Sequence, residues 1–161
     1  MNTLQMRVES LQRMAYTLLY PAQEIAGEDL RRLGTEVYRE ADSLFNEKGE
    51  TPELEASLCV ALLMGYNATM YNHGDKEAKK QAVLDRACKV LCTLPASVLK
   101  CRLLIYCYGE VYEEELLQEA NEIIQSWSDS ELSEEEQEVI KQTQSEICRM
   151  MEVEKENRGE K

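Results

Sequence analysis

Apolar residues recur every three or four positions through most of this chain, and that spacing constrains its fold more than any other feature. Three prolines and seven glycines in 161 residues leave few points at which regular structure can break. A spacing of three to four residues places apolar side chains on one face of an α-helix. No segment shows the strict alternation expected of a β-strand. The pattern predicts an all-α protein.

The chain divides into about seven antiparallel helices. Their predicted extents are residues 3–20, 28–47, 52–72 and 76–92, then a helix opened by segment 94–97 and running through Cys107, then 111–127, and a last helix from Ser133. The helix over 52–72 is nearly apolar from Leu58 to Met64, so we expect it in the middle of the core.

Local residue choices predict where these helices begin and end. Gly49 is placed to stop the second helix, and Gly109 the fifth. Thr51 supplies a hydroxyl N-cap, followed by proline at a position where its missing N–H has no cost. Ser133 and Glu136 have the spacing of a capping box, in which each side chain satisfies the other's backbone N–H.

We expect one domain over residues 1–153 and a frayed charged tail over 154–161. Two arrangements are compatible with the pattern, a plain helical bundle or stacked helical hairpins of the tetratricopeptide type. Segments 71–75 and 106–110 are 35 residues apart and resemble each other. That interval is close to the 34-residue period of such hairpins. Two copies leave both arrangements open.

The charge of the chain is unevenly distributed. The formal net charge is −13. Met1–Cys107 holds 14 acidic and 13 basic residues, whereas Tyr108–Lys161 holds 17 acidic and 5 basic residues. The last third of the chain should therefore present a strongly negative surface. A negative surface repels nucleic acid and favours a basic protein partner. A solvated face that keeps the chain soluble would give the same composition.

Catalytic and metal chemistry find little support in the sequence. The single histidine, His73, lies in a predicted turn, and the motifs of phosphate-binding loops and zinc proteases are missing. Cys88 and Cys92 are one helical turn apart, but they lie in apolar helical stretches rather than in a zinc knuckle. We therefore expect no enzyme, no cofactor and no metal.

The expected cellular location of the protein follows from two further features of the sequence. No apolar run approaches the length of a membrane span, and the first residues lack the layout of a signal peptide. We expect a cytoplasmic protein with reduced cysteines.

Tyrosines and charged residues around the two similar segments give a candidate partner-binding surface. Tyrosine and arginine are favoured anchors at protein interfaces. Tyrosines that anchor helix ends within the fold are the alternative. The candidate residues are Tyr66, Tyr71, His73, Arg86, Arg102, Tyr106, Tyr108, Tyr112, Glu113, Glu114 and Glu115.

Several ordered segments resemble the UpxZ family. They are Met1–Gln5, Leu62–Thr69, Gly74–Lys76, Val83–Arg86, Leu94–Ser97, Cys107–Val111, Glu114–Leu116 and Ile123–Trp127. The similarity covers residues 1 to about 140, and is looser over the first 50 residues and the acidic tail.

The resemblance implies a regulator encoded in capsular polysaccharide loci of gut bacteria. In that family, the regulator blocks the NusG-like antiterminators of other loci, so that one capsule tends to be made at a time. The partner implied is a NusG-like antiterminator protein, and no direct contact with nucleic acid or membrane is expected. An adaptor that binds RNA polymerase or a nascent transcript is the rival function. The resemblance indicates neither which antiterminators are inhibited nor the oligomeric state.

Overall fold

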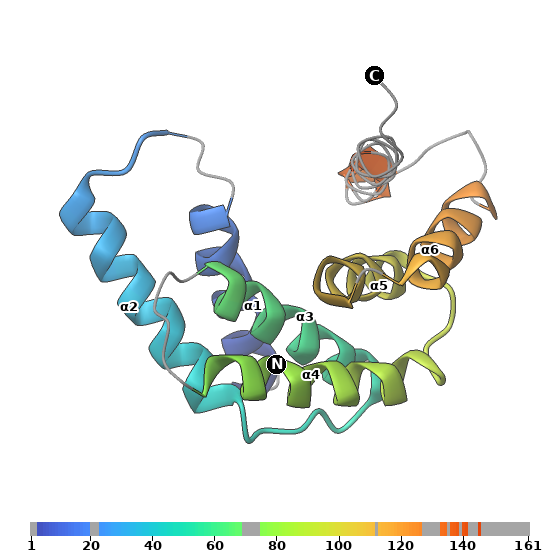
Figure 1. The fold of residues 1–161 in the computed structure, drawn as a ribbon, viewed down its shortest axis with the longest axis horizontal. Helices are drawn as coiled ribbons and strands as arrows, with labels where there is room; N and C mark the ends of the chain where they lie inside the picture. Colours follow the sequence, from blue (N-terminus) through green and yellow to red (C-terminus); the bar gives the residue numbers. More distant parts are fainter. Residues whose placement is uncertain are drawn as a thin grey trace, which may run out of the picture. The chain divides into compact units, whose positions relative to one another are not determined.

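A computed structural model confirms the all-α prediction (Figure 1). It describes residues 3–19, 23–68, 75–111, 113–126, 133–134, 136–138, 140–141 and 145. The helices are α1 (Thr3–Leu19), α2 (Gly27–Leu44), α3 (Pro52–Ala68), α4 (Lys76–Leu91), α5 (Val98–Val111) and α6 (Glu114–Ser126). Described positions after Ser133 also have helical backbone, where the last helix is predicted. The predicted tail over 154–161 lies outside the described residues.

The chain forms two compact units, Met1–Leu94 and Pro95–Lys161. In the first unit, α3 contacts α1, α2 and α4, and α1 also contacts α2. In the second unit, α5 contacts α6. A single domain over 1–153 stays a prediction, as does the choice between a bundle and stacked hairpins.

The core of the first unit is built around α3. Every residue of α3 from Leu58 to Tyr66 is buried, in agreement with its apolar sequence. Gly65 lies where three helices meet, because a Cβ there would be 3.2 Å from the Cβ of Ala41 and 3.4 Å from Leu11. The small residues of this junction let the helices approach closely.

The second unit has a core on α5. Cys101, Leu103, Leu104, Ile105, Cys107 and Tyr108 of this helix are buried. From α6, the buried residues are Leu117, Ala120 and Ile123, spaced three residues apart as on one helical face. The Sγ of Cys101 contacts the carbonyl oxygen of Ala120 at 3.7 Å, which joins the two helices.

Two predicted helix caps are confirmed. The backbone N–H of Leu54 donates to Thr51 Oγ1 at 3.1 Å, which satisfies an otherwise unpaired donor at the start of α3. Ser133 and Glu136 form the capping box, each backbone N–H donating to the other's side-chain oxygen at 3.1 Å.

Two predicted helix stops are wrong. Gly49 does not stop the second helix, since α2 ends at Leu44. It lies in the following loop, where a Cβ would collide with the backbone of Glu55, so a larger residue would push the loop away from α3. Gly109 does not stop the fifth helix, which continues to Val111 with Gly109 in its last turn. The second of the two similar segments, 106–110, therefore lies entirely within α5.

Candidate partner-binding surface

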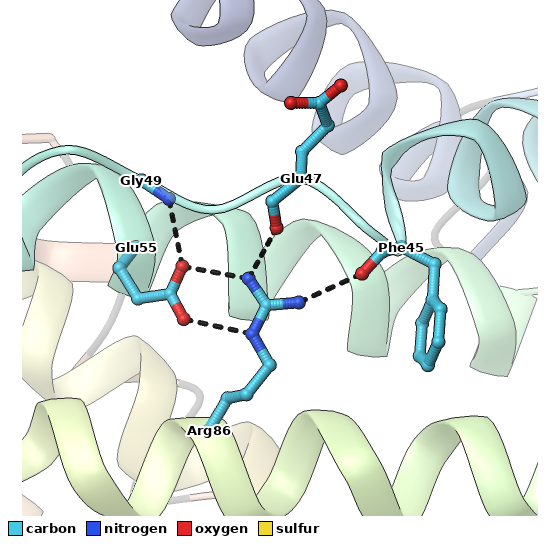
Figure 2. A network of polar contacts seen from close by, with 5 residues as sticks. All are labelled: Phe45, Glu47, Gly49, Glu55 and Arg86. Atoms are coloured by element: carbon cyan, nitrogen blue, oxygen red, sulfur yellow. Dashed lines mark hydrogen bonds and ion pairs between the residues drawn. The ribbon is translucent and has the colours of Figure 1, made fainter.

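Arg86 on α4, one of the predicted partner-binding residues, is fully engaged within the chain. Its Nε and Nη2 donate to the carboxylate of Glu55 at 2.9 and 2.8 Å, a bidentate pair (Figure 2). Its Nη1 donates to the carbonyl oxygen of Phe45 at 3.0 Å, and Nη2 also donates to that of Glu47 at 2.7 Å. The guanidinium thus ties α4 to α3 and to the α2–α3 loop, which is a structural role.

The carboxylate of Glu55 is held ionised by this network. Burial alone would raise its pKa, but hydrogen bonds from Arg86 and from the backbone N–H of Gly49 outweigh that effect, so the pKa of Glu55 is lowered. The same bond to Glu55 raises the pKa of Arg86 against the opposing effect of burial. Both groups are charged at neutral pH.

Tyr66 on α3 lies in the core, with an exposed fraction of 0%. Its hydroxyl donates to Asp42 Oδ1 at 2.9 Å, and Lys79 Nζ donates to the same oxygen at 2.8 Å. The rings of Tyr38 and Phe45 stand edge-on to that of Tyr66. This cluster joins α2, α3 and α4. Its burial gives Tyr66 a packing role in place of direct contact with a partner.

The other predicted tyrosines and His73 fall into three groups. Tyr108 is buried in the second unit, with 4% of its surface exposed, and cannot offer its ring to a partner there. Tyr106 is half-buried on α5. Tyr71, His73 and Tyr112 lie outside the described residues.

Arg102 and Tyr106 share one face of α5. They are four residues apart, so their side chains are neighbours on the helix, and both are half-buried. Arg102 makes no ion pair or side-chain hydrogen bond with any residue that the structure describes. The structure therefore brings together two of the predicted residues, and no residue that it describes compensates the charge of Arg102.

The predicted acidic residues Glu113, Glu114 and Glu115 are all exposed, where the chain enters α6. Acidic side chains in the first turn of a helix interact favourably with its dipole. Among the described residues, the carboxylates of Glu113 and Glu115 have no ion-pair partner. These charges are available to another molecule.

The cysteines offer no assembled metal site in the described part of the chain. No group of three or more metal-binding side chains comes together there. Cys88 on α4 and Cys92 directly after it are exposed, whereas Cys101 and Cys107 are buried on α5. Burial raises the pKa of Cys59 to about 12 and that of Cys101 to about 11, so both stay as neutral thiols.

No helix among the described residues is both long and apolar enough to span a membrane.

Sequence reasoning missed the partners that hold the candidate residues in place. The polar clusters around Arg86 and Tyr66 depend on Glu55, Asp42 and Lys79. None of these three residues was among the predicted candidates. The available signal was the position of Glu55 three residues before the buried Leu58, in a helix that is apolar over most of its length. An ionisable side chain in such a helix requires a partner when it is partly buried.

Comparison with known proteins identifies the family. Residues 8–109 match the model of the UpxZ family of transcription anti-terminator antagonists. The chain is similar to a crystal structure of a transcription anti-terminator antagonist UpxZ from Bacteroides uniformis ATCC 8492, at 47% sequence identity and a TM-score of 0.80. The match covers 89% of this chain and 92% of that one. No curated protein matches the chain. The chain belongs to the UpxZ family of transcription anti-terminator antagonists.

Proposed function

We propose that this protein binds NusG-like transcription antiterminators of non-cognate capsular polysaccharide loci and blocks their action. Family membership is the observation that carries the proposal, since the family is described as transcription anti-terminator antagonists. A regulator of this kind works by occupying a surface of another protein, with no chemical step. We expect it to work in the cytoplasm, where its target acts.

The acidic surface of the second unit is a physically suitable contact for such a partner. Proteins that act on transcribing polymerase contact nucleic acid or polymerase, and basic surfaces serve the first of these contacts. The exposed carboxylates of Glu113, Glu114 and Glu115 present negative charge to a basic surface. Charges at the rim of an interface mainly accelerate association, and each exposed pair contributes about 0.2–1 kcal/mol.

The test is binding to a panel of purified NusG-like antiterminators, cognate and non-cognate, by the wild type and by a triple variant. In the variant, Glu113, Glu114 and Glu115 are each changed to Lys. We expect the wild type to bind non-cognate members and the variant to associate more slowly, with a smaller dependence on salt. A wild type that binds no antiterminator contradicts the proposal.

A matched variant separates local from overall charge. Glu28 and Asp29 lie in the first turn of α2, and Glu24 lies in the loop before it; all three are exposed and have no ion-pair partner among the described residues. Changing these three to Lys alters the net charge equally. If both triple variants slow association to the same degree, overall charge and not the surface at α6 is responsible.

The rival function is an adaptor that binds RNA polymerase or a nascent transcript. No feature of the described residues favours it, and the net charge of −13 opposes binding to RNA. Binding of this protein to RNA from the leader of the locus at moderate salt would support the adaptor function.

A further inference from the structure

The face of α5 that is turned away from its core carries exposed or half-buried residues, among them Val98, Leu99 and Glu110. Arg102, Tyr106 and Gly109 follow one another at intervals of four and three, the spacing of neighbours along one side of a helix. Gly109 is exposed and the other two are half-buried, whereas the side chains on the remaining sides of this helix include all of its buried residues. We call this line of three residues the α5 strip.

Gly109 has no structural reason within the described chain to be glycine. It belongs to a helix, in which glycine is among the least favourable residues, and a Cβ there would meet no atom of the described residues within 4 Å. Gly65 differs, because a Cβ at that position would meet Ala41 and Leu11. The open space beside Gly109 would admit the backbone of another molecule close to α5.

The neighbours of Gly109 have the composition of an interface centre. Arginine and tyrosine are the residues that most often anchor interfaces. The guanidinium of Arg102 has no described partner, in contrast to that of Arg86, whose donors reach one carboxylate and two carbonyl oxygens. A partner segment lying over Gly109 would offer its main-chain carbonyl oxygens to Arg102.

We propose that the α5 strip is the surface on which a basic segment of the antiterminator lies, with its backbone close to Gly109. This inference rests on the proposed function and assigns it a location. Charge complementarity selects the occupant, because the exposed Glu113, Glu114 and Glu115 follow Gly109 closely in the sequence, where the chain enters α6. The tyrosine ring supplies apolar contact area, and the carboxylates face the basic side chains of the segment.

The test compares Gly109→Gln with Gly34→Gln in binding to the panel antiterminator for which the wild type has the highest affinity. Gly34 is the matched control, since it also lies in a helix, α2, and a Cβ there would likewise meet no described atom within 4 Å. Gly109→Gln should weaken the affinity at least tenfold, because its side chain occupies the space that the partner backbone needs. Gly34→Gln should leave the affinity within about twofold.

Gly109→Ala distinguishes an interface role from a role in folding. Alanine favours the helix, so this variant should melt about 2 °C higher than the wild type, yet bind the antiterminator more weakly. Equal binding by Gly109→Gln and the wild type overturns the proposal that the antiterminator lies on the α5 strip, while leaving the proposed function in place. Failure of the wild type to bind any antiterminator overturns both.

Discussion

The charges of the two units are used differently. In the first unit, around the junction of α2, α3 and α4, the half-buried charges meet within the chain. Arg86 pairs with Glu55 at 2.8 Å, and Lys79 pairs with Asp42 at 2.8 Å. In the second unit, Lys100 pairs with Glu119 at 2.8 Å, but Glu113 and Glu115 have no partner among the described residues. The difference teaches that the half-buried charges at the junction of α2, α3 and α4 stabilise the fold, whereas the exposed carboxylates at the start of α6 are available for binding.

The largest effect expected from this comparison is that of Arg86→Ala. The substitution leaves the carboxylate of Glu55 with the backbone N–H of Gly49 as its remaining donor and removes the donor of two loop carbonyl oxygens. We expect a cost of about 2–4 kcal/mol in the free energy of unfolding. Urea denaturation followed by circular dichroism measures it. Arg102→Ala is the control, with an expected change within about 0.5 kcal/mol. Equal losses for the two variants would break the comparison.

A smaller loss is expected for Tyr66→Phe. The ring keeps its place in the core, but Asp42 loses the hydrogen bond from the hydroxyl and retains the one from Lys79. We expect the free energy of unfolding to fall by about 1 kcal/mol, measured by thermal and urea denaturation. An unchanged stability would show that the hydroxyl contributes nothing to the junction.

Acid should destabilise the first unit through Glu55. Its pKa in the folded chain is below the ordinary value of 4.5, so its contribution to stability is present above pH 4.5. That contribution is lost as the pH falls through the folded pKa. Urea denaturation between about pH 6 and 3 should therefore show a steeper loss for the wild type than for Glu55→Gln. Parallel curves would contradict the assignment.

The smallest effect is expected for carboxylates of the second unit. Replacing Glu115 and Glu122 together by Gln should change the free energy of unfolding by less than about 0.5 kcal/mol, because both are exposed and have no described ion-pair partner. Urea denaturation is again the measurement. A loss above about 1 kcal/mol would show that these charges also serve the fold.

The helices of this chain were largely predictable because their signals are local. Apolar spacing gave the extents of α1, α3, α4 and α6 to within a few residues. The hydroxyl of Thr51 and the capping box of Ser133 follow from residues at most three positions apart. Gly109 misled because glycine both ends helices and occurs within them, and the two cases look alike in sequence.

The placement of candidate residues was less predictable because it depends on contacts between distant positions. Arg86 and Glu55 are 31 residues apart, and nothing in the local sequence pairs them. Tyr66 looked suited to an interface by its type, but its position in a helix that is apolar over most of its length indicated the core. Arg102 and Tyr106, which the helical spacing alone brings together, were predictable as neighbours.

The hydrogen bonds of Arg86 to the α2–α3 loop have a consequence for the order in which parts of the chain fold during synthesis. The carbonyl oxygens of Phe45 and Glu47 and the carboxylate of Glu55 receive their donors from a residue that the ribosome adds about 30 to 40 positions later. Until α4 has emerged from the ribosome, the α2–α3 loop lacks the hydrogen bonds from Arg86. A nascent chain halted before Arg86 would therefore expose the loop to proteases, which makes α4 the element that completes the first unit.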